Sequence, residues 1–156
     1  EREQKLYDYS AVVLADTEDA WHEILKKEGI DYREPKMEIF KGQVKSGCGI
    51  ANSGMGPFYC SKDETLYMDL SFYDSLIKDF GAKEGDFILS YVVSHEVGHH
   101  VQEVTGIMDQ YQKLASQMSE EERNALTVRL ELQADYLAGV VARYQEDKGY
   151  LDPRRH

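Results

Sequence analysis

The feature that most constrains this chain is a cluster of three histidines in the stretch S-H-E-V-G-H-H-V-Q, residues 94–102. The whole chain has only five histidines in 156 residues. On an α-helix, His95 and His99 are four residues apart, about one turn, so their imidazole rings project from the same face. Because neutral imidazole is a good zinc ligand, this spacing predicts a helix that brings two ligands to one metal ion.

Glu96 follows the first of these histidines and lies about 100° further around the predicted helix. From there its carboxylate can reach a water molecule on the metal without binding the metal itself. Zinc lowers the pKa of such a water towards about 7, so a carboxylate can accept its proton. We therefore predict Glu96 as a general base. His100 diverges from His99 by about 100°, which indicates a flanking role and not a ligand.

A motif with three fixed positions also occurs by chance, so the cluster needs a third ligand from another element. The stretch E-L-Q-A-D provides Glu131 and Asp135, again four residues apart. We predict that Glu131 binds zinc and that Asp135 accepts a hydrogen bond from the other ring nitrogen of a zinc-bound histidine. The alternative is a solvated acidic face, since the chain has 29 Asp and Glu residues.

Apolar residues around these carboxylates favour pairing over solvation, because a charged group among apolar side chains is costly unless it is satisfied. These neighbours are Leu126, Val128, Leu130, Leu132, Leu137, Ala138, Val140 and Val141. Gly98 and Ala134 would let the two helices approach closely. Glycine inside a helix costs about 1 kcal/mol relative to alanine, so a packing reason is expected for it.

Capping and periodicity signals predict a mostly helical α+β fold with a small early sheet. The sheet would pack on the histidine helix and on a long C-terminal helix that bears Glu131. We predict helices over 6–14, from Asp16 or Thr17 to 28, and over 71–80, 87–104 and 119–147. Strands are predicted over 36–44 and 65–70, with 46–57 as a loop. The length suits one domain, residues 1–156.

The overall charge bears on the possible partners. A net charge of −11 and a pI of about 4.9 argue against nucleic acid, since an acidic surface repels phosphate backbones. No run approaches the ~20 apolar residues of a membrane span, and we recognise no signal peptide. The sequence does not indicate an oligomeric state.

The two cysteines, Cys48 and Cys60, bracket a segment rich in Gly, Asn and Ser. A disulfide would restrict this segment and add roughly 3 kcal/mol in the chain-entropy model. Two buried thiols without a bond are the alternative. A zinc site from this pair is disfavoured because no second Cys or His pair lies at ligand spacing nearby.

Six stretches together carry a resemblance to a known family. They are T-E-D-A-W (17–21), S-G-C-G (46–49), G-P-F-Y-C (56–60), G-D-F (85–87), H-E-V-G-H-H-V-Q (95–102) and L-E-L-Q-A-D (130–135). With these motifs the chain resembles the bacterial neutral zinc metallopeptidases, of the gluzincin type with a zincin-like active-site helix. The resemblance implies zinc bound by His95, His99 and Glu131, with Glu96 as general base. It favours a disulfide between Cys48 and Cys60.

The resemblance also implies an extracytoplasmic domain that a membrane span tethers in the full-length protein. Members of the family usually continue with a segment similar to F-T-H-G-T-S, which has no match here, so no residue is assigned to the oxyanion. We expect a zinc-dependent endopeptidase acting on peptides or proteins, with substrate paired to the strand edge around 66–70. The alternatives are a zinc-stabilised interaction domain without useful turnover and a zinc hydrolase of non-peptide amides.

Overall fold

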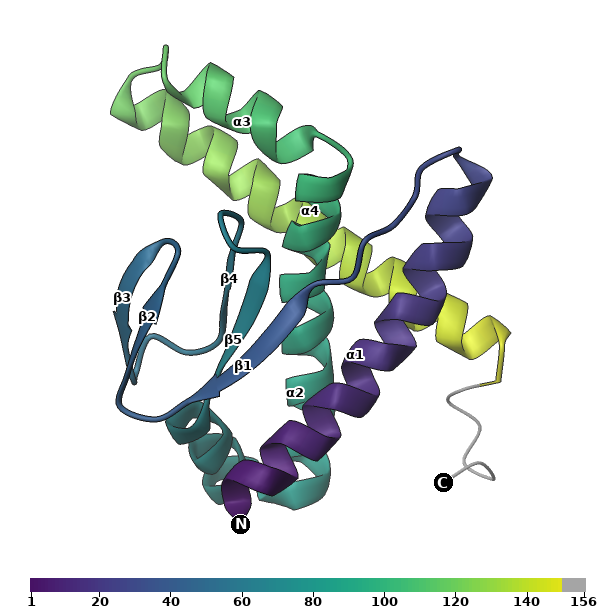
Figure 1. Ribbon diagram of the computed structural model, residues 1–156, viewed down its shortest axis with the longest axis vertical. Coiled ribbons are helices and arrows are strands. Elements are labelled where there is room, and N and C mark those ends of the chain that lie inside the picture. Colours follow the sequence, from purple (N-terminus) through teal and green to yellow (C-terminus); the bar gives the residue numbers. More distant parts are fainter. Residues whose placement is uncertain (150–156) are drawn as a thin grey trace.

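Helix α2 (Leu70–Val104) lies at the centre of the fold, and both the sheet and the other helices contact it. The computed structural model describes residues 1–149. In Figure 1 the strands lie on one side of α2, and the long helix α4 (Glu120–Asp147) crosses α2. The remaining helices are α1 (Arg2–Lys27) and α3 (Ile107–Ala115). The predicted α+β, mostly helical class is confirmed. Within residues 1–149, no helix is long and apolar enough to cross a membrane.

Five strands among residues 1–149 form two separate sheets. Strand β5 (Thr65–Asp69) is the middle of a three-stranded sheet, parallel to β1 (Lys36–Phe40) and antiparallel to β4 (Phe58–Cys60). Strands β2 (Gln43–Ser46) and β3 (Gly49–Asn52) form an antiparallel hairpin. Because β5 is central, the predicted pairing of substrate with the edge of this strand is wrong. Strand β4 lies at an edge of the sheet and next to α2.

Strand β5 confirms the predicted segment but is buried on both faces. Leu66 and Met68 pack in the main core against the helices. Tyr67 faces the other way and packs with Phe40 and Cys60 in a second cluster under the hairpin. Leu70, which we predicted as the last strand residue, is instead the first residue of α2. All residues of β5 are buried, because helices cover one face and the cluster under the hairpin covers the other.

The two helices predicted before the sheet are a single helix, α1. Thr17 does not cap a second helix, because its hydroxyl is fully buried and donates to the carbonyl of Leu14 at 2.7 Å within the same helix. Side chains on both sides of the predicted break, Leu6, Leu14, Trp21 and Leu25, pack in the same core. Tertiary packing along the whole helix therefore overrides a local capping signal.

The predicted strand 36–44 is broken by Gly42, whose φ of 79° turns the chain into the hairpin. The hairpin strand β3 lies inside the predicted loop, and neither β4 nor α3 was predicted. Strands of three or four residues carry little periodicity of their own and are defined by their partners. Gly81 was predicted to end a helix, and it has non-helical φ and ψ of 82° and 165°. The structure continues beyond it as the kinked helix α2.

The boundaries around α4 follow the sequence closely. Ser119 caps the helix, and its hydroxyl accepts from the backbone N–H of Glu122 at 3.2 Å. The Glu122 carboxylate accepts from the backbone N–H of Ser119 at 3.0 Å, which completes a capping box at the predicted start of the helix. Gly106 adopts a left-handed conformation between α2 and α3, as expected for a glycine at a helix end.

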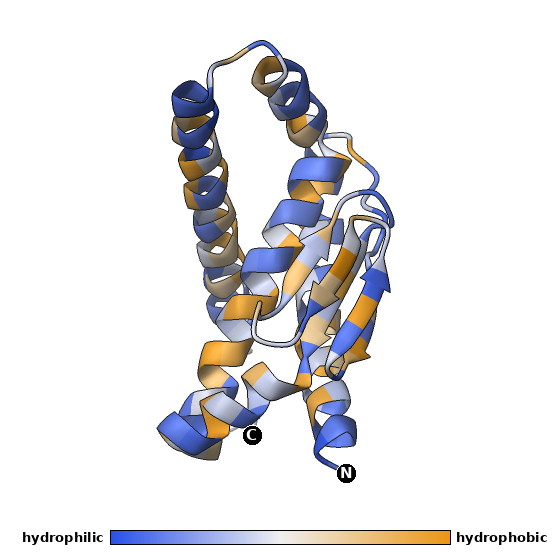
Figure 2. Ribbon diagram, turned by 90° about the vertical axis from the view of Figure 1, so that its left-hand side faces the viewer, coloured by the Kyte–Doolittle hydropathy of each residue, from blue (hydrophilic) through white to orange (hydrophobic). Residues whose placement is uncertain are grey.

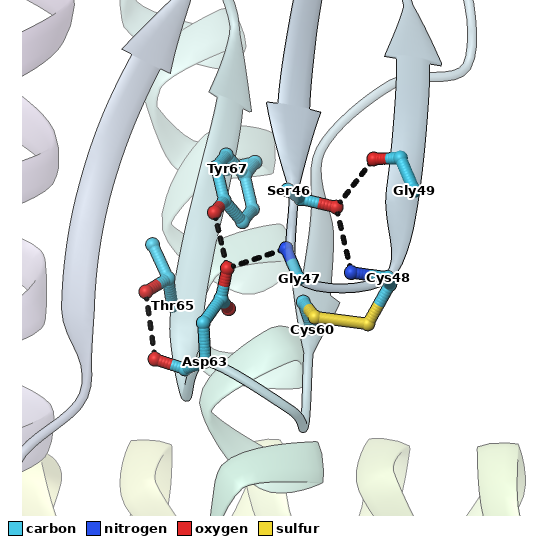
Figure 3. Close-up of a disulfide and its surroundings, with 8 residues drawn as sticks. All are labelled: Ser46, Gly47, Cys48, Gly49, Cys60, Asp63, Thr65 and Tyr67. Carbon is cyan, nitrogen blue, oxygen red and sulfur yellow. Dashed lines mark hydrogen bonds between the residues drawn. A yellow bond between two sulfur atoms is a disulfide. The ribbon is translucent and has the colours of Figure 1, made fainter.

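A disulfide joins the hairpin to the edge of the sheet (Figure 3). Cys48 lies in the turn between β2 and β3, and Cys60 ends β4, with 5.8 Å between their Cα atoms. The Asp63 carboxylate supports the same turn by accepting hydrogen bonds from the backbone N–H of Gly47 and from the hydroxyl of Tyr67. The disulfide predicted from the sequence is thus present and holds the hairpin against β4.

Candidate metal site

The predicted site residues come from two helices that pack closely against each other. Helix α2 carries His95, Glu96 and His99, and α4 carries Glu131 and Asp135. A Cβ atom added at Gly98 would lie only 3.0 Å from the backbone oxygen of Ala134 and 3.2 Å from its Cα. The predicted close approach of the helices at Gly98 and Ala134 is therefore confirmed.

Three potential ligand atoms converge where the helices cross. The side chains of His95, His99 and Glu131 have one ligand atom each within 4.8 Å of one another. The Nε2 atoms of His95 and His99 lie 3.0 Å and 3.2 Å from the same carboxylate oxygen, Oε1 of Glu131. The structure thus brings together the three residues that the sequence grouped as ligands.

Each histidine is held through its other ring nitrogen. Nδ1 of His95 donates to Oδ1 of Asp135 at 2.7 Å, the contact expected for Asp135. The hydroxyl of Tyr91 donates to the same oxygen at 2.5 Å and lowers the pKa of Asp135. Nδ1 of His99 donates to Oε1 of Gln102 at 2.8 Å. Gln102 was not predicted to have a role, although its place three residues after His99 on a helix could have indicated a contact.

These contacts leave acceptor atoms facing one another. With Nδ1 of each ring donating its proton, Nε2 of each neutral ring carries a lone pair. The Glu131 carboxylate is also only an acceptor when ionised. Three acceptors within a few ångströms repel one another unless a cation or a proton lies between them. Two imidazole nitrogens and a carboxylate oxygen are a donor set suited to zinc.

The predicted apolar surroundings of the carboxylates on α4 are wrong. Figure 2 shows orange and blue segments alternating along α4, and several of its apolar residues are in fact exposed. Val128 is 56% exposed, Leu132 60% and Tyr136 69%. The Glu131 side chain is itself about half exposed, at 51%. Burial among apolar neighbours therefore does not explain why a carboxylate lies at position 131. The position of Glu131 opposite the two histidines provides the explanation.

Glu96 lies beside this cluster with its carboxylate in a largely dry environment. Burial raises the pKa of Glu96 to about 7, and the nearby Glu131 carboxylate adds to the rise. Opposing this rise are a hydrogen bond from the backbone of Tyr59 in β4 and, when its ring is protonated, the charge of His99. In the metal-free protein the Glu96 carboxyl group thus has a pKa near neutral. Its side chain lies between α2 and the edge strand β4.

The raised pKa of Glu96 predicts how the stability of the metal-free protein depends on pH. Between 4.5, the ordinary value, and about 7, the unfolded state releases this proton before the folded state does. The free energy of unfolding of the metal-free protein should therefore fall as pH rises through this window. Glu96→Gln removes the effect, so the variant should lose less stability between about pH 5 and about pH 8.

Thermal unfolding of both proteins in chelator, as a function of pH, measures this difference. Other groups titrate in the same range, but they are shared by the two proteins and cancel in the comparison. Identical pH slopes for the wild type and Glu96→Gln would contradict the raised pKa.

His100 is a structural residue and does not join the cluster. It is fully buried and bridges the hydroxyl of Tyr59 and the carbonyl of Arg33, each at 2.6 Å. Because the carbonyl can only accept, Nε2 of His100 carries the proton and Nδ1 accepts from Tyr59. Burial lowers the pKa of His100, which favours its neutral form. Its place apart from the other two histidines agrees with the flanking role predicted for it.

The chain is similar in sequence to a known protein family and to individual proteins. The sequence profile of the family described as "Putative neutral zinc metallopeptidase" matches residues 1–154. The uncharacterized protein YpfJ of Escherichia coli (strain K12) is 44% identical over 150 residues, covering 96% of this chain and 52% of that protein. The uncharacterized protein Rv2575 of Mycobacterium tuberculosis is 45% identical over 129 residues, covering 78% of this chain and 42% of that protein.

The chain thus spans about half the length of these relatives. No solved structure matches it significantly. Because the match to the family extends over nearly the whole sequence and includes both helices of the site, the chain belongs to the neutral zinc metallopeptidase family.

Proposed function

We propose that this chain is a zinc-dependent peptidase domain, with His95, His99 and Glu131 as the zinc ligands. The observation that carries the proposal is the convergence of three acceptor atoms with no donor among them. Both Nδ1 atoms already have partners that can only accept in these contacts, so both Nε2 atoms are free to bind a cation. Three protein ligands are the number found in catalytic zinc sites, which keep one further position open.

Glu96 is proposed as the general base and, later, the general acid. A bound zinc ion would act as a Lewis acid, making water acidic near neutral pH and polarising a carbonyl. Glu96 accepts the proton of the attacking water and delivers it to the nitrogen of the leaving amine. Burial raises the pKa of Glu96 to about 7 in the metal-free protein. The charge of a bound zinc ion would favour the ionised carboxylate, which is the form that accepts the proton.

Strand β4 is the proposed docking edge for an extended substrate. It forms one of the two edges of the three-stranded sheet, and the backbone of Tyr59 within it reaches Glu96. A peptide that added to this edge as a further strand would make main-chain hydrogen bonds with β4. Its scissile bond would then pass close to Glu96 and to the two histidines of α2.

Removal and return of the metal tests the proposal. Purified protein incubated with a mixture of unrelated peptides should cleave internal peptide bonds, and a chelator should abolish the cleavage. Addition of one equivalent of zinc to the dialysed protein should restore it. Activity that persists in the chelator would overturn the proposal.

Zinc content, thermal stability and the range of substrates cleaved together distinguish the alternatives. A protein that binds one zinc ion, gains thermal stability from it and cleaves no peptide would support a zinc-stabilised interaction domain. Cleavage of simple amides without cleavage of peptides would support a hydrolase of non-peptide amides.

We further propose that the domain works in an extracytoplasmic compartment. The disulfide between Cys48 and Cys60 supports this location, because such bonds persist in oxidising compartments and are rare in the cytosol. The membrane tether implied by the family resemblance stays a prediction. Location of the disulfide-bonded protein by cell fractionation tests the compartment.

A further inference from the structure

We propose that Gln102 is a positioning residue that sets two of the three ligands, His99 and Glu131, relative to each other. The inference rests on the proposed zinc site. Gln102 is fully buried on α2, three residues after His99. It is the one buried amide side chain in the described core, so its hydrogen bonds have no competition from solvent.

The amide of Gln102 uses both of its ends. Its Oε1 accepts from Nδ1 of His99 at 2.8 Å. Its Nε2 donates across the helix interface to the backbone carbonyl of Leu130 at 2.9 Å and to Oε1 of Gln133 at 2.9 Å. The carbonyl of Leu130 can only accept, which fixes the orientation of the amide: nitrogen towards α4 and oxygen towards His99.

That orientation determines the tautomer of His99. Since Oε1 of Gln102 can only accept, the proton of the neutral ring must lie on Nδ1. Nε2 then presents its lone pair to Glu131, as a metal ligand must. A side chain that could not accept at this position would allow the other tautomer, in which Nε2 is protonated and cannot bind a cation.

The same amide sets the position of α4. Leu130 directly precedes Glu131, so a hydrogen bond to its carbonyl fixes the helix at the point from which the third ligand projects. One buried group therefore links the ring of His99 to the backbone beside Glu131. Removing the amide should disturb both ligands at once, while a structural role alone would alter stability without altering the site.

The two histidines differ in how they are held, and the charge of the site gives a reason. His95 is held by the charged Asp135, which with Glu131 places two negative charges near the cluster. A neutral amide at Gln102 orients His99 without adding a further negative charge to the site and, unlike a carboxylate, can also donate to Leu130.

The test compares zinc affinity in Gln102→Met and Gln133→Met, measured by competition with a chelating dye on folded protein. Methionine has nearly the length of glutamine but cannot make these hydrogen bonds. We expect zinc affinity to fall about 10–100-fold in Gln102→Met, as is typical when a partner that orients a metal ligand is lost. Gln133 is exposed and makes only one of the contacts, so Gln133→Met should change the affinity by less than about threefold.

A second measurement needs no variant and covers the case in which Gln102→Met does not fold. Nitrogen-15 NMR of the histidine rings in the metal-free wild type reports which nitrogen of His99 carries the proton. We expect Nδ1 to be protonated. Protonation mainly at Nε2, or wild-type zinc affinity in folded Gln102→Met, would overturn the inference. A wild type that binds no zinc would overturn the proposed function instead, while the NMR result would still decide how Gln102 holds His99.

Discussion

Replacing Glu96 with glutamine is expected to lower kcat/KM for peptide hydrolysis about 10²–10⁴-fold, the usual contribution of a positioned acid–base group. Glutamine has nearly the same shape but cannot accept the proton of the attacking water or return it to the leaving nitrogen. Zinc affinity should change little, because Glu96 lies outside the set of three converging ligand atoms. Steady-state kinetics on a single peptide, together with the zinc content of each protein, measures both effects.

Glu103→Gln is the matched control for this variant. Glu103 lies on the same helix and is partly buried, and burial also raises its pKa, but it is not one of the clustered residues. Its replacement should leave kcat/KM close to the wild-type value. Full activity in Glu96→Gln, with zinc bound, would show that another group transfers the proton.

Replacing Gly98 with alanine is expected to lower the free energy of unfolding by up to about 2 kcal/mol, because forcing an extra methyl group into a packed interface usually costs about 1–3 kcal/mol and part of this cost is offset. The added Cβ would lie 3.0–3.2 Å from the backbone of Ala134, and a helix backbone cannot yield as a flexible side chain can. This cost opposes and exceeds the gain of about 1 kcal/mol that alanine normally brings to a helix. Separation of α2 from α4 should also weaken zinc binding, because the ligands come from both helices.

Gly139→Ala provides the opposite case on the partner helix. Gly139 lies in α4 with nothing within 4 Å of an added Cβ, so alanine there should stabilise the protein by roughly 0.5–1 kcal/mol. Denaturant unfolding of the two variants measures the contrast. Stabilisation of both would mean that the helices do not approach as closely as the structure has them.

The part of the site that the sequence could predict is the part carried by helices. Residues four apart share a helix face whatever surrounds them, so the pairs at 95 and 99 and at 131 and 135 could be recognised one by one. Gly98 pointed to a close helix approach for a similarly local reason. The start of α4 could be predicted for the same reason, because Ser119 and Glu122, which form its capping box, lie within four residues of each other.

The strands and helix breaks were harder to predict, because their causes lie elsewhere in the chain. Thr17 resembles a cap in sequence but lies inside a helix whose whole length packs on the core. Strand β4 has three residues and exists through its pairing with β5. The edge for substrate was assigned to the wrong strand, since strand order in a sheet is not a local property.

The sequence by itself determined the helical class, the two helices that bear the candidate ligands and the pairing of residues one turn apart on each. Only the tertiary structure decided that both Nε2 atoms face Glu131, that Gln102 holds His99, and that β4 is the edge beside Glu96. The physical reason is the separation along the chain over which each effect acts. Helix periodicity acts over four residues, whereas the contact between Gln102 and Leu130 joins residues 28 apart and depends on how two helices cross.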